Sequence, residues 1–305
     1  MSGAETFQEN LRWVPAAAAI AREGGARLRE FFAQGVETEY KGDVDLVTVA
    51  DQTVETLIRT RLSEVFPKHG IYGEEGTRER LDGEYRWYVD PLDGTTNFAH
   101  GFPHFCVSLG LEERPVGLAP EQDGILVAAV IYDPMRDELF TAERGCGAWF
   151  NGNGLNGKRM RVSRAVELGE ALVATGFPSR KRHDSPNIHF YHEFSLRSHG
   201  VRRAGSAALD LAYVAAGRLD GFWEFNLNPW DTAAGILLVE EAGGLVTNFA
   251  GGKYRLDSRE TLASNGLFHV EILGLFVEMF SGSNLSPIPS AQEYAARRAA
   301  RAARG

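Results

Sequence analysis

Hydrophobic residues recur with two different periods along the chain, and the change of period divides it into regions. A helical period predicts helices over residues 5–34 and 52–66. Between residues 106 and 150, apolar runs alternate with turn signals, which indicates a large and mostly antiparallel sheet. From residue 171 onward, predicted strands and helices alternate up to a last helix over 266–280. The pattern therefore predicts an α+β first half followed by α/β alternation in the second half.

The domain organisation follows from the spacing of these elements. No segment rich in proline, glycine or serine separates independent domains before residue 282. We therefore predict a single unit over residues 1–282, with a metal- and phosphate-binding half at about 5–150 and a substrate half at about 151–282. Residues 283–305 hold a proline-containing spacer and then arginines among alanines. This composition predicts a flexible, basic and partly helical tail.

Composition and charge limit the class of protein. The chain has 305 residues, of which 44% are hydrophobic and 24% charged, as in ordinary soluble globular proteins. A net charge of −9 argues against broad nucleic-acid binding, so we expect no nucleic-acid partner. The two cysteines, Cys106 and Cys146, provide neither a disulfide framework nor a zinc spacing, and a cytoplasmic location fits them. Without a signal-peptide pattern or a membrane-length apolar run, no membrane association is expected.

Two acids three residues apart, Asp90 and Asp93, follow the apolar run 87–89, which resembles the end of a buried strand. In a turn, both carboxylates can converge on one point, where two like charges need a cation between them. Mg²⁺ prefers such oxygen ligands and often shares them with a phosphate. Gly94, Thr95 and Thr96 then lead into a predicted helix start, where free backbone N–H groups can bind an anion. A phosphate site or a simple helix-capping turn would both fit this stretch.

Three further acids stand at predicted element boundaries. Glu74 follows a predicted strand over 70–72, while Asp51 and Asp231 each precede an apolar helical stripe. Taken singly, Glu74 indicates a polar turn, and Asp51 and Asp231 indicate helix N-caps. Acids at the ends of successive strands can also assemble one site, so both interpretations stay open at this level.

Taken together, these pieces resemble the inositol monophosphatase family, within the Mg²⁺-dependent, lithium-sensitive phosphatases. The shared motifs are Gly-Glu-Glu at 73–75, Asp-Pro-Leu-Asp-Gly-Thr-Thr-Asn-Phe at 90–98, Trp-Asp-Thr-Ala-Ala-Gly at 230–235, Val-Asp-Leu-Val-Thr at 44–48 with Asp51, Gly-Phe-Pro-His-Phe at 101–105 and Gly-Ser-Ala-Ala at 205–208. The resemblance covers about residues 5–270. It implies a layered αβαβα sugar-phosphatase fold, a homodimer, two or three Mg²⁺ ions per site, and hydrolysis of inositol 1-phosphate or a related sugar or polyol phosphate.

The resemblance also implies a role for each matching residue. For the first ion, the implied ligands are Glu74, Asp90 and the Leu92 carbonyl. For the second ion, they are Asp90, Asp93 and Asp231. Glu74 and Thr95 are implied to orient and deprotonate the attacking water, with Asp51 and Thr48 in support. Asp45 is similar to an acid near the entrance of the family's site. Substrate binding is implied for Asp93, Gly94, Thr95, Gly205, Ser206, Ala207, Glu224 and Asp231.

The substrate remains open between several hypotheses. Thr96 and Asn97 are similar to the inositol monophosphatase branch, whereas relatives acting on 3′-phosphoadenosine 5′-phosphate or histidinol phosphate often carry Lys in place of Thr96. Fructose 1,6-bisphosphatase activity is also known in relatives with this architecture. A third hypothesis is a regulatory protein that contacts RNA or the transcription machinery, as some bacterial relatives do. Because every expected acid is present and no Ser-His-Asp or Cys-Arg nucleophile is visible, we favour catalysis with water as the nucleophile.

Overall fold

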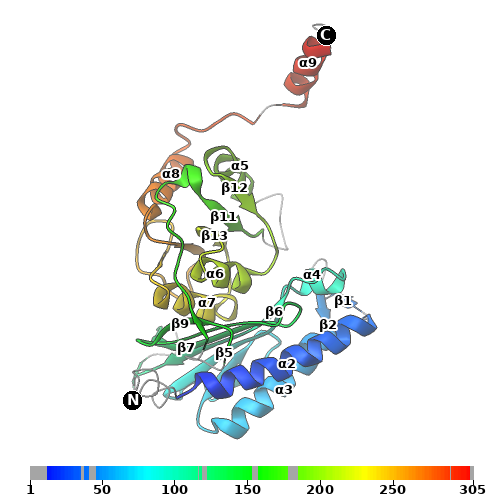
Figure 1. Cartoon of the computed structure of the whole chain (residues 1–305), viewed down its shortest axis with the longest axis vertical. Coiled ribbons are helices and arrows are strands. Elements are labelled where there is room, and N and C mark those ends of the chain that lie inside the picture. The colour runs from blue at the N-terminus through cyan, green and yellow to red at the C-terminus, as the bar shows by residue number, and fades with distance from the viewer. Residues whose placement is uncertain are drawn as a thin grey trace.

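The computed structural model describes residues 12–35, 38–40, 46–115, 117–118, 122–152, 157–177, 185–288 and 290–302, with only the backbone at 38–40 and 46–48. Within these ranges, helices and sheets alternate in five layers, in the order helices, sheet, helices, sheet, helices (Figure 1). This arrangement confirms the layered αβαβα fold that the resemblance implies.

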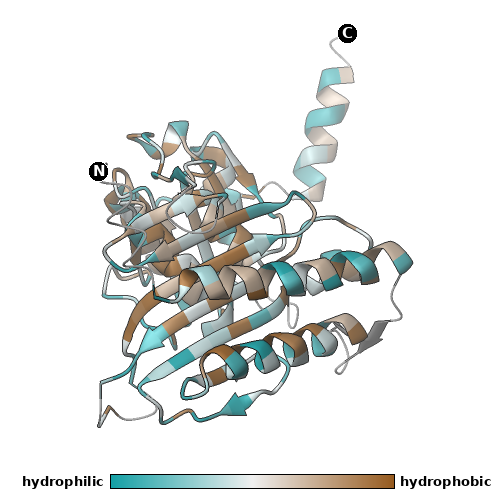
Figure 2. Ribbon diagram, turned by 60° about the horizontal axis from the view of Figure 1, so that its bottom comes forward, coloured by the Kyte–Doolittle hydropathy of each residue, from teal (hydrophilic) through white to brown (hydrophobic). Residues whose placement is uncertain are grey.

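The first layer consists of two helices, α2 (Val14–Gln34) and α3 (Val49–Val65), which cover one face of the larger sheet. Figure 2 shows hydrophobic residues recurring along both helices with hydrophilic residues between them. The buried positions of α2 include Val14, Ala18 and Leu28, which follow the predicted helical period. The helix begins at Val14 within the predicted range of 5–34, and residues 5–11 lie outside the described part of the chain.

The larger sheet has eight strands in the order β10-β9-β8-β7-β6-β5-β3-β4. Only the β3–β5 pair is parallel, which confirms the predicted mostly antiparallel sheet. A separate antiparallel pair consists of β1 (Thr38–Tyr40) and β2 (Leu46–Thr48). The bounds of the eight strands are β3 (Gly70–Gly73), β4 (Arg78–Glu79), β5 (Tyr85–Asp93), β6 (Cys106–Glu113), β7 (Ile125–Asp133), β8 (Glu138–Glu143), β9 (Gly147–Phe150) and β10 (Lys158–Arg159).

The middle layer consists of α6 (Ala207–Ala215) and α7 (Pro229–Glu241), which lie between the two sheets. Most of their residues are buried, as expected for helices that are apolar on nearly all sides. The second sheet has the order β12-β11-β13-β15-β14, with β11 parallel to both neighbours and the other pairs antiparallel. Its strands are β11 (Leu172–Thr175), β12 (Gly200–Arg202), β13 (Gly221–Phe225), β14 (Leu245–Thr247) and β15 (Glu260–Ser264).

The outer layer consists of α5 (Asn187–Arg197) and α8 (His269–Ser281), and a short 3-10 helix, η1 (Leu168–Glu170), precedes β11. After α8, the chain leaves the body, and its last described element is α9 (Ala291–Ala302), which buries none of its residues and stands apart in Figures 1 and 2. The partly helical tail is therefore confirmed, while its flexibility stays a prediction. No helix in the described residues is both long and apolar enough to cross a membrane.

Two predicted helix starts are wrong by one turn. Asp51 is the third residue of α3 and not its N-cap, because α3 begins at Val49. Asp231 is the third residue of α7, whose N-cap is Asn228, and the Asn228 backbone N–H donates to Asp231 Oδ2 at 2.7 Å. An apolar stripe marks the buried face of a helix but does not fix the residue at which the helix begins. The correction places both acids inside the first helical turn.

Candidate functional site

A cavity of about 560 Å³ lies where the two halves of the chain meet. Its wall is formed where β3, β5 and β13 end and where α4 (Thr95–Ala99), α6 and α7 begin. Eleven of the predicted site residues line it: Glu74, Asp90, Leu92, Asp93, Gly94, Thr95, Gly205, Ser206, Ala207, Glu224 and Asp231. The fold therefore brings the predicted metal-binding and substrate-binding residues to one place.

The remaining predicted residues lie behind this wall or cannot be placed. The Thr95 hydroxyl oxygen is 3.2 Å from Asp51 Oδ1 and 3.0 Å from the Leu92 carbonyl oxygen, so Asp51 lies one hydrogen bond away from the cavity. Thr48 ends β2 directly before α3. Asp45 lies outside the described residues.

An irregularity at the end of β5 places two acids on the cavity. The pairing of β5 with β6 shifts between Asp90 and Asp93, and the Leu92 backbone N–H donates to Asp90 Oδ1 at 2.9 Å. The apolar run 87–89 had predicted that the strand ends before Asp90. This prediction is wrong, because β5 continues to Asp93. Gly94 follows in the left-handed region with φ of 103° and caps α4, so the predicted helix is present but begins at Thr95 and not after Thr96.

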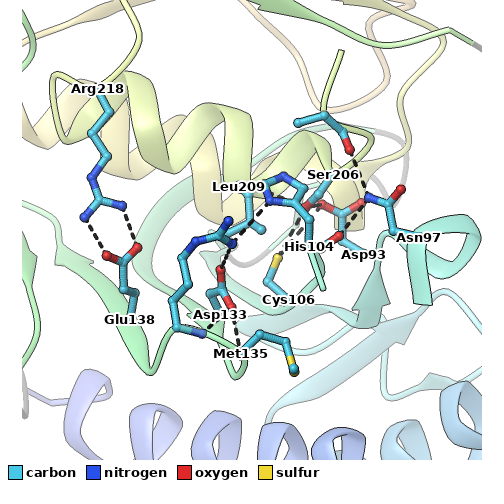
Figure 3. A network of polar contacts seen from close by, with 12 residues as sticks. Asp93, Asn97, His104, Cys106, Asp133, Met135, Glu138, Ser206, Leu209 and Arg218 are labelled. Atoms are coloured by element: carbon cyan, nitrogen blue, oxygen red, sulfur yellow. Dashed lines mark hydrogen bonds and ion pairs between the residues drawn. The ribbon is translucent and has the colours of Figure 1, made fainter. Parts of the chain in front are cut away.

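The start of α6 contacts the end of β5, as Figure 3 shows. Asp93 Oδ2 accepts hydrogen bonds from the Ser206 hydroxyl at 2.6 Å and from the Ala208 backbone N–H at 2.7 Å. Nearby, the Asn97 side-chain amide donates to the carbonyl oxygens of His104 at 2.8 Å and Ala204 at 2.9 Å. These bonds hold the two halves of the cavity wall together.

Burial of several carboxylates in one cavity perturbs their ionisation. Burial, reinforced by the charge of Asp231, raises the pKa of Glu74 well above its usual value. Burial and the charge of Glu74 likewise raise the pKa of Asp90. Burial and the charge of Asp93 raise the pKa of Asp231 to about 7. The pKa of Asp93 is also raised by burial, while the hydrogen bonds from Ser206 and Ala208 oppose that shift.

The charge of the cavity sets what it can bind. Seven carboxylates and one guanidinium are among its lining residues, so a phosphate would be repelled unless cations neutralise the wall. Carboxylate and carbonyl oxygens of this kind are the ligands that Mg²⁺ takes, often together with substrate phosphate. The donor chemistry therefore fits Mg²⁺. Within the described ranges, no three acidic, histidine or cysteine side chains already have the spacing of a metal site.

Besides Glu75, which adjoins the predicted Glu74, the sequence analysis missed two charged residues of the cavity, Asp210 and Arg203. Asp210, on α6, is 2% exposed and has a pKa raised by burial and by Asp93, against the opposing charge of Arg203. Asp210 is also the neighbouring charge that most raises the pKa of Glu224, which burial already raises well above normal. An acid inside an otherwise apolar helix was the available signal for Asp210. Arg203 carried no distinguishing signal in the sequence.

Comparisons with known proteins agree with this geometry. A sequence model described as the inositol monophosphatase family matches residues 10–280. The chain is 43% identical over 251 residues to inositol-1-monophosphatase of Rhizobium meliloti, covering 81% of this chain and 89% of that protein. It is 46% identical over 236 residues to Nus factor SuhB of Pseudomonas aeruginosa, covering 75% and 82% respectively.

A solved structure of inositol monophosphatase from an Anabaena species gives the same result for the fold. It is similar to this chain with a TM-score of 0.74 and 36% identity, covering 94% of this chain and 99% of its own. The layered fold, the acid-lined cavity and the match over most of the chain thus agree. This chain belongs to the inositol monophosphatase family.

Proposed function

We propose that this protein is a Mg²⁺-dependent phosphomonoesterase that hydrolyses inositol 1-phosphate to inositol and phosphate. The observation that carries the proposal is the excess of buried carboxylates around a cavity that opens onto the first turn of α4. The first hydrogen bond of α4 runs from Phe98 N–H to the Gly94 carbonyl, so the preceding N–H groups of Gly94 and Thr95 are available to a phosphate. Family membership and the inositol-1-monophosphatase of R. meliloti support the same activity.

The metal ligands in this proposal are those named from the resemblance. Glu74, Asp90 and the Leu92 carbonyl would hold one Mg²⁺, and Asp90, Asp93 and Asp231 would hold a second, with a third ion left open. When bound, Mg²⁺ supplies positive charge that polarises the phosphate ester and a neighbouring water and neutralises the developing negative charge. Ion binding also relieves the mutual repulsion that raises the pKa of these carboxylates.

The side chains of the cavity then position the reacting groups. Glu74 and Thr95 orient the attacking water, and Glu74 accepts its proton. The Thr95 hydroxyl is held in place because Asp51 and the Leu92 carbonyl both lie within hydrogen-bonding distance of it. Thr48, the last residue of β2 before α3, is proposed to support the same group. The N–H groups of Gly94 and Thr95 would bind the phosphate oxygens and so hold the ester for attack by the water.

The opposite wall of the cavity is proposed to bind the polyol. Glu224 projects from β13 and is 9% exposed, and Asp210 beside it adds a second acceptor for ring hydroxyl groups. Gly205, Ser206 and Ala207 contribute the start of α6 to the same wall. A cyclic polyol, with several adjacent hydroxyl donors, matches this pair of carboxylates.

Phosphate release by the purified chain tests the proposal. The panel consists of inositol 1-phosphate, histidinol phosphate, fructose 1,6-bisphosphate and 3′-phosphoadenosine 5′-phosphate, each with Mg²⁺ and with a chelator. We expect the highest kcat/KM for inositol 1-phosphate and no turnover without the metal. A higher kcat/KM for another compound of the panel would make that compound the assigned substrate. Metal-independent turnover would refute the mechanism.

A second candidate is a regulatory role through contact with RNA or the transcription machinery. Its support is the relative named Nus factor SuhB and the exposed arginines of α9, which are Arg297, Arg298 and Arg301. Binding of single-stranded RNA to the full chain at several salt concentrations tests it. Salt-sensitive binding, lost when the three arginines are changed to alanine, would favour this role.

The oligomeric state and location belong to the proposal as well. We infer a cytoplasmic homodimer, as the resemblance implies. Light scattering coupled to size-exclusion chromatography of the full chain should give twice the mass of 33.5 kDa. A monomeric mass at micromolar concentration would contradict the dimer.

A further inference from the structure

A buried acid outside the cavity holds one of its walls. Glu55 lies on α3, and only 4% of its surface is exposed. Its carboxylate accepts three hydrogen bonds: from the Glu75 backbone N–H at 2.7 Å, from the Thr77 backbone N–H at 3.0 Å and from the Thr77 hydroxyl at 2.6 Å. All three donors belong to the turn between β3 and β4, which carries Glu74.

This turn is held from a second side as well. The Glu74 backbone N–H donates to the Val89 carbonyl of β5 at 3.1 Å, and the Gly73 N–H donates to the Thr77 carbonyl at 2.9 Å. A Cβ atom at Gly73 would overlap the carboxylate of Glu55, so the acid packs directly on the backbone where β3 ends. The backbone at Glu74 is thus fixed between β5 and α3.

The same helix contacts the other residue proposed to orient the water. Asp51 and Glu55 are four residues apart, which places them on one face of α3. Asp51 lies within hydrogen-bonding distance of the Thr95 hydroxyl, while Glu55 bonds the turn of Glu74. One face of α3 therefore supports both Glu74 and Thr95.

We propose that Glu55 is a positioning residue that sets the Mg²⁺ affinity of the site by fixing the turn of Glu74. The inference rests on the proposed role of Glu74 as a metal ligand. Three donors converge on Glu55, and a carboxylate can accept all of them. The amide of glutamine would turn an NH₂ group toward at least one of these donors, so the neutral variant cannot reproduce the arrangement. Partners of this kind, one bond behind a metal ligand, typically change metal affinity by about 10–100-fold.

The test compares Glu55→Gln with the wild-type chain. Mg²⁺ binding is measured directly by titration calorimetry, and the Mg²⁺ concentration for half-maximal phosphate release is measured in parallel. We expect a Kd for Mg²⁺ raised about 10–100-fold, with much of kcat recovered at saturating Mg²⁺. Glu64→Gln is the matched control, because Glu64 is an exposed acid of the same helix that pairs with Arg61 at 3.1 Å. It should leave the Kd within about twofold of wild type.

A second variant keeps the test decisive if Glu55→Gln fails to fold. Thr77→Val removes the hydroxyl donor and keeps the buried carboxylate and both backbone donors. It should weaken Mg²⁺ binding several-fold. If a folded Glu55→Gln or Thr77→Val chain binds Mg²⁺ as tightly as wild type, the positioning role is wrong. If the wild-type chain itself shows no Mg²⁺ binding, the proposed function fails first, so the two failures are distinct.

Discussion

The Ser206 hydroxyl donates a 2.6 Å hydrogen bond to Asp93 Oδ2, although the two residues are 113 positions apart in the chain. Ser206 is the N-cap of α6, and its oxygen also accepts a hydrogen bond from the Leu209 backbone N–H at 3.4 Å. One hydroxyl group therefore starts a helix of the second half and fixes an acid of the first half. Figure 3 shows Ser206 beside both Asp93 and Leu209, and only its contact with Asp93 crosses the boundary between the halves.

Changing Ser206 to alanine removes both of these hydrogen bonds. We expect the free energy of unfolding to fall by about 1–2 kcal/mol, because an N-cap and a hydrogen bond to a charged group are lost together. Urea denaturation followed by circular dichroism measures the change. Ser195→Ala is the control, since the Ser195 hydroxyl is exposed and bonds only within α5, and its effect should stay within about 0.5 kcal/mol. Equal losses in the two variants would contradict the role of Ser206.

Replacing Asp93 with asparagine separates chemistry from folding. The amide oxygen can still accept hydrogen bonds from Ser206 and Ala208, so the fold should persist. The lost charge removes a proposed Mg²⁺ ligand, and phosphate release should fall by on the order of 10³-fold. Phosphate release and circular dichroism are measured on the same preparation. Retained phosphatase activity in this variant would refute the metal site.

Replacing Asp210 with asparagine should weaken recognition of the polyol. A hydrogen bond to a charged group contributes about 1.5–3 kcal/mol, so kcat/KM for inositol 1-phosphate should fall roughly tenfold or more. The fall should appear mainly in KM, because Asp210 faces the polyol and not the phosphate in the proposed arrangement. Para-nitrophenyl phosphate, which carries no ring hydroxyl groups, is the control substrate and should be hydrolysed equally well by both chains. An equal loss with both substrates would place Asp210 in the chemistry instead.

Replacing Asp210 with asparagine should also change how the melting temperature depends on pH. Burial and the charge of Asp93 raise the pKa of Asp210 above its value in the unfolded chain. The folded state therefore binds the proton of the Asp210 carboxyl group more tightly than the unfolded chain does. The contribution of this proton to the free energy of unfolding is present at low pH and is lost as the pH rises through the folded pKa. The asparagine side chain of the variant has no such proton to lose. The melting temperature of Asp210→Asn minus that of wild type, measured without metal, should therefore rise from about pH 4.5 to about pH 8. A difference independent of pH would contradict this origin.

Replacing Gly176 with alanine tests whether the Glu224 carboxylate must keep its present position. A Cβ atom at Gly176 would overlap the Glu224 carboxylate, so Gly176→Ala should displace that side chain and raise KM for inositol 1-phosphate several-fold. Gly169→Ala is the matched control, because no heavy atom lies within 4 Å of the Cβ position there. KM measurements on both variants decide the point. Similar KM values for Gly176→Ala and wild type would show that the Glu224 carboxylate is not needed in its present position.

Much of the fold was predictable because burial follows sequence period. The apolar runs of β6 and β7 and the stripe of α3 lie where the period places them, since each of these elements packs against a neighbouring layer. The first turns of α3 and α7 were placed too late, because each contains an acid that interrupts the apolar stripe and is also a residue type that favours an N-cap. The three-residue difference matters here, since it moves Asp51 and Asp231 from caps into the helices.

The site was predictable only as far as its residues form short motifs. Asp90, Asp93 and Glu74 stand in recognisable strings beside the ends of strands, and all three line the cavity. Asp210 and Glu55 lie within helices, and their importance depends on which distant segment each side chain meets. Glu55 contacts a turn about 20 residues away, and Asp210 lies beside Glu224 of another element. The local sequence pattern does not indicate such long-range contacts.

Residues from both halves of the chain form the cavity, so it can be completed only after the second half has been synthesised. When only the first half has left the ribosome, Asp90 and Asp93 are present, but Ser206, Ala208 and Asp231 are not. Asp93 must then wait for the start of α6 before it can accept its hydrogen bonds from Ser206 and Ala208, whereas Asp90 bonds the Leu92 N–H within the first half. Contacts this far apart in sequence form late, because their loop-closure entropy is large. Phosphatase activity should therefore be the last property to return on refolding, after the secondary structure is already in place.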